Sequence, residues 1–522
     1  MRLRLLLLAA VLWPGVAAAA DAVLRRAIAA EPGTLDPQSG ESVYQLRIDA
    51  DLFEGLTAIA PGGAVVPGQA ESWAVSPDGL VWRFELRPGL AWSNGDALTA
   101  QAFVYSFRRL VDPANAFRGA FLAESIRNAK PLIGRKAADP AVLGVAAPDP
   151  LTVEITLDAP NSALPELLAL LPPVNRAAVE SAGRDAFKPE HFVGNGAYRL
   201  TEWRPHDRLV MERNPHYHAP AAIGRVEYYP IEDQAEAYKR YRAGDLDLTD
   251  GVPEDQLDEI RRDLAGEYKT SPAFGLVYLG FNLSRAPFKD NPKLRAALTL
   301  AIDRSALVDK ILHGNAVPAD GWVPRGLDLY RNAAILGAGT SQDAREAAAR
   351  QAYAEAGYSA EHPLDLELAY NTSDSNKRLM IAVAAMWQKV LGVRTSLRNM
   401  ELRAFLDLRQ KHAETEAFRA GFAAPYQDPL PLLELLRSGS VYNDMVYANP
   451  EFDALLAKAA AAPDKPARLA GLAAAEAIGL ADFPAAPLYF LVDARLVKPY
   501  VAGWQPSPRD TFRSQDLLIA AH

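Results

Sequence analysis

The pattern that most constrains the fold lies in the second half of the chain, where a strand, a helix and a second strand are predicted in succession. Apolar side chains alternate over residues 364–370, recur at helical spacing over residues 379–390, and alternate again over residues 393–397. Gly392 ends the helix. Two strands joined through a helix run parallel, with a right-handed crossover. The pattern therefore predicts an α/β lobe whose sheet contains parallel strands.

An earlier segment, residues 51–113, predicts a small α/β module of its own. Residues 81–87 alternate between apolar and charged side chains, which is typical of a half-buried strand. Thr99 is placed to cap a following helix, and Asp112-Pro113 ends it. Each element has one apolar face, formed by Trp82, Phe84 and Leu86 in the strand and by Phe103, Phe107, Leu110 and Val111 in the helix.

The remaining elements are predicted from the same periodicities and from the turn residues between them. Strands are expected at residues 23–29, 151–157, 198–200, 209–211, 274–282, 418–422 and 488–497, and helices at residues 161–171, 234–243, 304–313 and 343–357. Asp303 is expected to cap the third of these helices, and Asp343 with Glu346 resembles a capping box for the fourth. The run 274–282 is expected to carry the chain between lobes, and the run 488–497 to return it.

The length and net charge of the chain exclude some classes of protein. A chain of 522 residues is too long for one ordinary domain, and 49% hydrophobic with 23% charged residues is typical of a soluble globular protein. The formal net charge is −9, and it becomes −11 without residues 1–20, which contain two arginines and no acid. An acidic chain without a basic tract lacks the clustered cations that bind phosphates. Nucleic acid is therefore set aside as a partner.

The N-terminus predicts a signal peptide over residues 1–20. Two arginines precede an apolar run from Leu5 to Val16, and alanines at 18–20 form an A-x-A-like cleavage site. The run is too short to span a bilayer, which leaves an uncleaved anchor as the lesser alternative. The chain has no cysteine, so a lipid-modified N-terminal cysteine, thiolate zinc sites and a cysteine nucleophile are excluded. We expect an exported, unanchored periplasmic protein without direct membrane insertion.

Sequence motifs for nucleotide, cofactor or catalytic chemistry are absent. The chain has no Walker-type phosphate loop, no complete dinucleotide fingerprint and no G-x-S-x-G nucleophile elbow. His216 and His218 have a spacing that a metal can use on a strand, but they follow Asn214-Pro215 without a carboxylate or third histidine nearby. A loop is the simpler interpretation. We expect no metal, no cofactor and no catalytic residue, although a hydrolase with two carboxylates distant in the chain remains an alternative.

Five ordered blocks of sequence resemble one family. They are EPGTLDP, DLFEGL, PGQAESW, DGLVWRFELRPGLAWSNGDALTA and FVYSFRRLVDP, within residues 31–113. In this order they are similar to the signature of the large peptide-type solute-binding proteins of bacterial ABC importers, family 5 of the extracellular solute-binding proteins. The resemblance extends from Glu31 to His522 and favours the oligopeptide and murein-peptide branch.

This resemblance implies a bilobal α/β fold of the Venus-flytrap type, with three domains and mixed sheets flanked by helices. Domain I is expected to be discontinuous, over residues 21–53, 177–278 and 493–522. Domain II is expected at residues 54–176, and domain III at residues 279–492. Hinge motion at the two crossing segments is expected to bury the ligand between the lobes.

The resemblance also implies positions for ligand contacts. Arg419 stands in an R-A-G-F motif where oligopeptide-binding members have a cleft arginine, and it follows a strand at the edge where open α/β lobes bind ligands. Arg409 matches a cleft arginine that can pair with a ligand carboxylate. The alternatives are a structural ion pair for Arg419 and a solvent-facing helix position for Arg409. The other matching positions are Glu41, Val43, Phe121, Gly421 and Phe422.

One position departs from the family pattern. Six residues after Arg419, oligopeptide-binding members have a short acidic side chain that holds the α-ammonium of the peptide, and this chain has Pro425. A buried ammonium must be paired with a negative charge, so this anchor is expected to be lost. Asp428 and Glu41 are candidate substitutes. The hypothesis is a ligand that lacks a free α-amine here or pairs it elsewhere, such as an N-blocked peptide, a cell-wall peptide or a non-peptide.

The expected function is that of the substrate-binding component of an ABC importer. Such a protein captures peptides between two closing lobes and delivers them to membrane permease subunits that work with cytoplasmic ATPases. We expect a monomer that carries out no covalent chemistry. The alternatives are a binder of haem, a metal chelate or a conjugate on the same fold, a periplasmic peptidase or amidase, and a periplasmic chaperone or sensory co-receptor.

Overall fold

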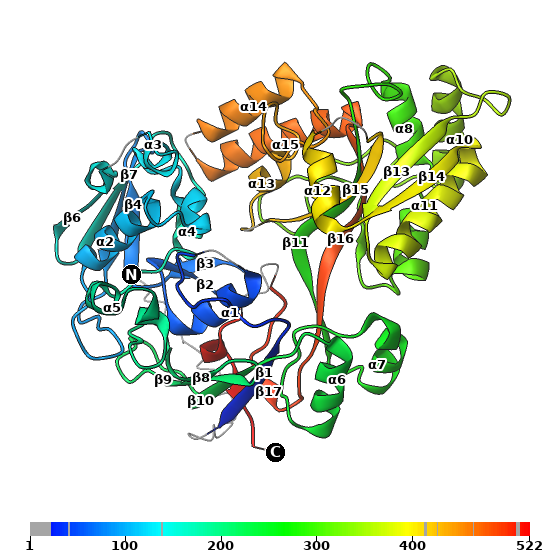
Figure 1. Cartoon of the computed structure of the whole chain (residues 1–522). Coiled ribbons are helices and arrows are strands. Elements are labelled where there is room, and N and C mark those ends of the chain that lie inside the picture. Colours follow the sequence, from blue (N-terminus) through cyan, green and yellow to red (C-terminus); the bar gives the residue numbers. More distant parts are fainter. Residues whose placement is uncertain are drawn as a thin grey trace, which may run out of the picture.

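The computed structural model describes residues 22–39, 42–136, 139–411, 415–424, 426–462, 464–507 and 512–521, with the backbone alone for Val43. The predicted signal peptide, Glu41 and Pro425 lie outside these ranges. The chain forms three bodies, each with a sheet of its own (Figure 1). The expected α/β class is confirmed.

The first body is built on a four-stranded sheet in the order β1-β10-β9-β8. Its strands are β1 (Val23–Ile28), β10 (Arg225–Pro230), β9 (Arg208–Arg213) and β8 (Tyr198–Arg204), and only β1 and β10 are parallel. The strands predicted at residues 198–200 and 209–211 are confirmed and pair as a hairpin, with Leu200 opposite Met211 and both buried. Helix α1 (Val43–Leu52) packs Ile48 and Leu52 into the same core. Helices α6 (Gln234–Ala243) and α7 (Leu257–Asp263) form a smaller core beside it.

The second body has an antiparallel sheet in the order β4-β5-β7-β6. Its strands are β4 (Ala70–Val75), β5 (Val81–Leu86), β7 (Thr152–Thr156) and β6 (Val145–Asp149), and helix α2 (Ala100–Val111) packs on them. The predicted alternation is confirmed, since the apolar side chains of β5 are buried and its charged ones are exposed. Thr99 is the N-cap residue of α2, without a side-chain capping hydrogen bond.

One helix of the second body is shorter than predicted. A helix was expected over residues 161–171, and the structure has α4 over Leu164–Leu168. Pro165 explains the difference. In a helix that began at residue 161, this proline would stand in the interior, where its ring would clash with a preceding carbonyl, whereas near the start of α4 it is tolerated.

The third body contains a mixed sheet of six strands in the order β12-β16-β11-β15-β13-β14. The strands are β12 (Val317–Pro318), β16 (Ala485–Leu496), β11 (Tyr268–Phe281), β15 (Ala417–Ala423), β13 (Asp365–Asn371) and β14 (Arg394–Met400). The prediction of parallel strands is confirmed, because β13 and β14 are parallel, with Leu366 opposite Thr395. Helix α11 (Asp374–Leu391) joins them, and Gly392 ends it in the left-handed region.

Helices cover both faces of this sheet. Neighbouring residues of β11 point to opposite faces: Val277 and Leu279 join one apolar core, and Leu276 and Tyr278 join another. The first core includes α8 (Pro292–Leu300), α10 (Gln342–Glu355) and α11. The second includes α12 (Leu402–Lys411), α13 (Pro429–Leu433), α14 (Pro450–Ala460) and α15 (Lys465–Asp482).

Two long strands connect the first and third bodies (Figure 1). β11 and β16 are antiparallel, and their pairing extends from Tyr268 opposite Leu496 to Gly280 opposite Ala485. Leu496 belongs to a core of the first body, and Ala485 to a core of the third. The predicted crossing segments are confirmed, and β11 begins six residues earlier than predicted. A register shift between Pro272 and Leu276 admits the proline to the strand.

Two helix predictions in the third body were wrong in detail. A single α-helix was expected over residues 304–313, but α9 covers only Arg304–Ala306 and a π-helical turn follows over Leu307–Ile311. Asp303 caps α9 as predicted, accepting a hydrogen bond from the Ala306 amide at 3.0 Å. The cap of α10 is Ser341 rather than Asp343, because the Ser341 hydroxyl accepts from the Ala344 amide.

The other elements are short or peripheral. They are β2 (Thr57–Ile59), β3 (Val65–Pro67), β17 (Val501–Ala502), β18 (Leu518–Ile519), α3 (Ala129–Ile133), α5 (Arg176–Ala182) and 3₁₀ turns at Arg118–Ala123, Pro140–Val142, Gly183–Phe187, Glu254–Gln256 and Ser514–Asp516. Within the described ranges, every helix is too short or too polar to cross a membrane.

Candidate ligand-binding site

The predicted contact Arg419 lies on β15, near the centre of the third body's sheet. β15 pairs with β11 from Ala417, opposite Phe281, to Ala423, opposite Gly275. On its other side, the register with β13 covers only Ala417 and Phe418. The segment 419–423 therefore extends beyond β13, and this edge of β15 offers backbone groups to a further extended chain.

Arg419 is half-buried, and its nearest polar contact in the described part of the chain is a neutral side chain. Its Nε is buried without a hydrogen-bond partner among the described residues, and its guanidinium lies close enough to Tyr489 on β16 to act on that hydroxyl. Burial raises the pKa of Tyr489, and the Arg419 charge opposes that rise. Among the described residues, no carboxylate forms an ion pair with Arg419. The alternative that Arg419 forms a structural ion pair is therefore not supported within the described residues.

Gly421 and Phe422 continue the same strand. A Cβ built on Gly421 would lie 3.5 Å from an Arg419 guanidinium nitrogen and 3.5 Å from a Val277 methyl group. The glycine is exposed and leaves the strand surface next to Arg419 open. The half-buried Phe422 ring lies 6.0 Å from the exposed ring of Tyr442 in an edge-to-face arrangement. An aromatic pair therefore borders the open strand edge.

Arg409 already has a negatively charged partner. It lies on α12, forms an ion pair with Asp444, and its side chain is 14% exposed. Its guanidinium also lies over the rings of Phe405 and Phe418, at 5.6 and 5.4 Å from the ring centroids. The alternative of a solvent-facing helix position is therefore wrong. A ligand carboxylate would have to share Arg409 with Asp444.

Tyr278 is buried at a position that the charges of both arginines reach. The sequence indicates it only as one residue of an apolar strand. It is 1% exposed, and its ring lies 4.9 Å from that of Trp322. Burial raises the pKa of Tyr278 to about 12, while the charges of Arg409 and Arg419 oppose the rise. Both cations therefore act on one buried phenol, although they belong to different elements.

Asp428 is held in a structural ion pair. Its two oxygens accept hydrogen bonds from Arg468 at 2.5 and 2.8 Å, and both side chains are 5% exposed. The same carboxylate caps α13 by accepting from the Leu430 amide at 2.9 Å. An ammonium from a ligand would have to compete with a buried guanidinium. This geometry weighs against Asp428 as the substitute for the lost anchor.

The other predicted contacts lie in the first or second body or outside the described residues. Phe121 lies in the 3₁₀ turn Arg118–Ala123 of the second body, with its side chain 45% exposed. Val43 begins α1 in the first body. Glu41 and Pro425 are outside the described residues. The structure thus places Arg419, Gly421 and Phe422 on one strand, with Arg409 over the ring of Phe418 on the same strand, while the remaining contacts stay predictions.

The paired histidines lie beside a carboxylate that is distant in the sequence. His218 Nε2 is 2.5 Å from a Glu54 oxygen, and the Tyr217 hydroxyl donates to the other oxygen at 2.6 Å. The expectation that no carboxylate lies nearby was wrong, because 164 residues separate these partners in the chain. Gln69 and Arg513 also donate to Glu54. Within the described ranges, no group of three histidine or acidic side chains is placed to hold a metal ion.

The bodies also contact one another away from the two crossing strands. Lys465, at the start of α15 in the third body, lies 3.6 Å from Glu166 on α4 of the second body. Arg378 on α11 lies 3.3 Å from Glu254 in a 3₁₀ turn of the first body. Both contacts are ion pairs between charges of opposite sign. They bridge the third body to each of the other two.

A family model matches most of the chain. The model describes the middle region of the bacterial extracellular solute-binding proteins of family 5, and it matches residues 64–444. The periplasmic murein peptide-binding protein MppA of Escherichia coli is 36% identical over 96% of this chain and 93% of its own length. The periplasmic oligopeptide-binding protein OppA of Salmonella typhimurium is 37% identical over 97% and 94%. A probable deoxycholate-binding periplasmic protein of Escherichia coli, YgiS, is 36% identical over 94% and 92%.

Solved structures show the same fold. The unliganded open form of the murein tripeptide-binding protein MppA superposes with a TM-score of 0.87, at 36% identity over 97% of this chain and 98% of that one. The Haemophilus influenzae OppA complex with the peptide RPPGFSPFR superposes with a TM-score of 0.76, at 33% identity over 97% and 100%. The expected bilobal architecture is therefore confirmed.

Proposed function

Because this chain belongs to family 5 of the bacterial extracellular solute-binding proteins, we propose that it captures peptides between its two lobes and delivers them to the permease of an ABC importer. The observation that carries the proposal is the open edge of β15 next to Arg419, a cation without an acidic partner among the described residues. Relatives with over a third of their residues identical are named as peptide-binding proteins.

The strand edge suits an extended peptide. Backbone hydrogen bonds to segment 419–423 would supply affinity that does not depend on ligand sequence, as in other cases of strand addition. Gly421 keeps the approach to that edge open, and the aromatic pair of Phe422 and Tyr442 offers apolar surface. Water-filled side-chain pockets would then tolerate varied ligands. Arg419 would bind a carbonyl or carboxylate of the ligand.

We further propose that the ligand has no free α-amine beside Arg419. The acidic residue that anchors this amine in oligopeptide-binding members is replaced by Pro425. Asp428, the nearest described acid after it, is bound to Arg468. The proposal is tested by calorimetry with one peptide in free and N-acetylated forms. Equal affinities would support it, and a strong preference for the free form would show that another acid holds the amine.

The remaining expectations are proposals on the same basis. Removal of residues 1–20 would leave a monomer in the periplasm without a lipid anchor, and permease and ATPase subunits would perform transport without any catalysis by this chain. The division into domain I (21–53, 177–278, 493–522), domain II (54–176) and domain III (279–492) is supported by separate apolar cores in the three bodies.

The deciding experiment is native mass spectrometry of the protein purified from its own periplasm, with bound molecules identified after denaturation. We expect short peptides, or peptides with blocked N-termini, and we expect Arg419→Gln to co-purify with much less of them. The Arg394→Gln variant changes an exposed arginine on β14 and serves as the control. A single non-peptide mass, such as a bile salt, would instead favour the alternative that the YgiS relative represents.

A further inference from the structure

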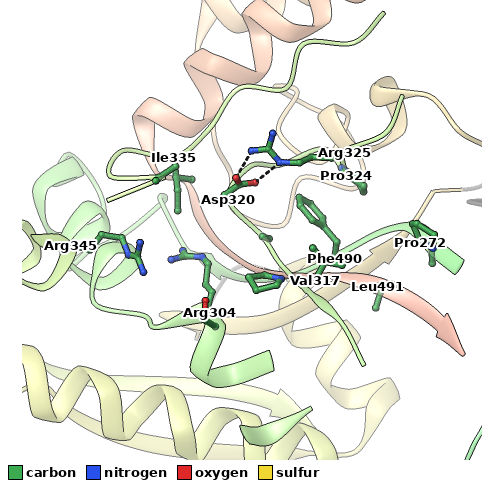
Figure 2. A pocket seen from close by; sticks show the side chains of 16 residues that line it. Pro272, Arg304, Val317, Asp320, Pro324, Arg325, Ile335, Arg345, Phe490 and Leu491 are labelled. Atoms are coloured by element: carbon green, nitrogen blue, oxygen red, sulfur yellow. Dashed lines mark hydrogen bonds and ion pairs between the residues drawn. The ribbon is translucent and has the colours of Figure 1, made fainter. Parts of the chain in front are cut away.

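A second site is suggested by a pocket at the β12 edge of the third body's sheet (Figure 2). Its volume is about 530 Å³, which is within the range that holds small organic ligands. None of the described peptide contacts predicted above lines it. Its apolar wall includes Val317, Pro318, Ile335, Phe490 and Leu491.

Arg304, at the start of α9, brings a buried positive charge to this pocket. The residue is 6% exposed, and its guanidinium donates to three backbone carbonyls, those of Pro487 at 2.7 Å and of Ile302 and Thr299 at 3.2 Å each. All three acceptors are neutral. Burial lowers the pKa of Arg304, and the charge of Arg345 lowers it further. Asp320 and Asp303 oppose this fall in pKa, but among the described residues no carboxylate forms an ion pair with Arg304.

Arg345, in the first turn of α10, supplies a second cation. Its Nη atoms donate to the Thr340 carbonyl and the Gln342 side-chain oxygen, both at 2.7 Å, and both acceptors are neutral. Its Nε is buried without a hydrogen-bond partner. In Figure 2 the side chains of Arg304 and Arg345 extend toward each other. Two like charges in a partly buried site repel, and an anion between them removes that cost.

The acidic side chain in the pocket lining already has a positively charged partner. Asp320 is the one acid among the lining residues, and it forms an ion pair with Arg325 on the side of the pocket away from Arg345 (Figure 2). Three arginines and one acid leave an excess of positive charge. A strongly hydrated anion would gain little from the apolar wall, whereas an anion with an apolar body would contact both parts of the lining.

We propose that this pocket binds a small organic carboxylate, with the carboxylate between Arg304 and Arg345 and its apolar body against Ile335 and Phe490. Guanidinium groups bind carboxylates through paired charge-assisted hydrogen bonds. The bonds to Thr340 and Gln342 use one N–H on each Nη atom of Arg345, which leaves a second N–H on each Nη to donate to the carboxylate. The site is independent of the peptide-binding proposal, since it shares none of the residues on which that proposal depends.

The test uses 4-bromobenzoate as the probe and calorimetry on the full mature chain, refolded after denaturation to release bound molecules. The neutral 4-bromobenzamide has nearly the same shape and is expected to bind at least about tenfold more weakly, because a charged hydrogen bond contributes at least about that factor. The Arg345→Gln variant should show a similar loss for 4-bromobenzoate, and Arg345→Lys should restore part of it.

Control variants and a crystal structure distinguish binding of the probe in this pocket from binding elsewhere on the protein. Arg350→Gln changes an exposed arginine on the same helix that pairs with Glu346, and it should leave 4-bromobenzoate binding unchanged. Arg419→Gln should also leave it unchanged, and Arg345→Gln should still co-purify with the same peptides as the unmodified protein. Anomalous scattering from bromine in a crystal of the complex should place the probe between Arg304 and Arg345.

Three kinds of result would overturn the proposal. Equal binding of 4-bromobenzoate and 4-bromobenzamide would show that the arginines do not bind the carboxylate. Equal affinities for Arg345→Gln and Arg350→Gln, or a bromine position beside Arg419, would place the probe elsewhere. Occupancy at crystal concentration only, without measurable binding in solution, would also count against a built site.

Discussion

Two buried or half-buried arginines in the third body have opposite electrostatic situations. Arg468 is compensated by Asp428 through two hydrogen bonds, whereas Arg419 lies near the neutral phenol of Tyr489 and has no acidic partner among the described residues. A charge that is already compensated contributes mainly to the fold. A charge that lacks an acid is available to a ligand. The two residues therefore predict different consequences when they are changed.

Substitution of Arg468 by Met should destabilise the protein by about 3–5 kcal/mol, because it leaves the Asp428 carboxylate buried without its partner. Thermal unfolding measures the loss, and the double variant Asp428→Asn with Arg468→Met should recover part of it. The folded fraction should bind ligand as the unmodified protein does. Weakened binding in the folded fraction, without a loss of stability, would show instead that this pair belongs to the ligand site.

Asp49 on α1 predicts a pH-dependent stability. Burial raises the pKa of Asp49 well above its ordinary value of 3.8, and one of its oxygens has no hydrogen-bond partner. The folded protein therefore keeps this proton to a higher pH than the unfolded chain does. Its stability should decrease as the pH rises from about 4 through the folded-state pKa, because the folded state must then carry a buried charge.

The Asp49→Asn variant removes that charge. It should unfold at a higher temperature than the unmodified protein at pH 8, by the equivalent of on the order of 1 kcal/mol, and the difference should shrink toward pH 4. Thermal unfolding at the two pH values measures this, with the exposed Asp245→Asn as a control. A constant difference at both pH values would mean that packing, rather than ionisation, distinguishes the amide side chain from the natural carboxyl.

At the scale of elements, the sequence patterns correctly predicted those helices and strands that depend on residues close together in the chain. The alternation in β5, the helix α11 with Gly392 after it, and the strand that carries Arg419 all follow from side-chain periodicity and turn residues. Pro165 was overlooked within a predicted helix, although its effect is also local. The π-helical turn after Ala306 has no counterpart in a periodicity of 3.6 residues.

Most of the candidate site could not be predicted in this way, because its side chains meet through tertiary packing. Arg409 and Asp444 are 35 residues apart in the chain, and Arg468 and Asp428 are 40 apart. Tyr489 approaches Arg419 only because β11 alone separates β16 from β15 in the sheet. The resemblance to a family indicated which residues to examine, but not which of them already had partners.

The close packing between β11 and β15 predicts the effect of adding one methyl group at Gly280. A Cβ on Gly280 would lie 2.3 Å from the ring of Phe418, which is fully buried and paired with Gly280 across the strands. Gly280→Ala should therefore destabilise the protein by about 1–3 kcal/mol. Gly266→Ala, where nothing lies within 4 Å, is the matched control in thermal unfolding. Similar unfolding temperatures for the two variants would show that the ring has room to move.

At the scale of the whole molecule, the ion pair between Lys465 and Glu166 links the second and third bodies away from the crossing strands. The Lys465 side chain is exposed and that of Glu166 is mostly buried. Partly exposed pairs contribute up to about 1 kcal/mol, and salt screens them. Lys465→Gln should therefore increase the radius of gyration of the ligand-free protein slightly at low ionic strength. Small-angle X-ray scattering measures this, with the exposed Lys458→Gln as a control. A difference that persists in concentrated salt would have another cause.

Segments far apart in the sequence meet in the first body, and this arrangement implies an order for folding. Arg26 on β1 donates to the Ser514 hydroxyl at 2.8 Å, and the Ser514 amide donates to Asp51 at 2.6 Å. A chain that folds from its N-terminal side onward cannot complete these bonds until the segment that contains Ser514 is available. The second body, whose buried core extends from Leu56 to Leu171, has no such delay. The sheet of the second body can form before β1 has met β10, so the body that contains the first strand of the chain is completed after the second body.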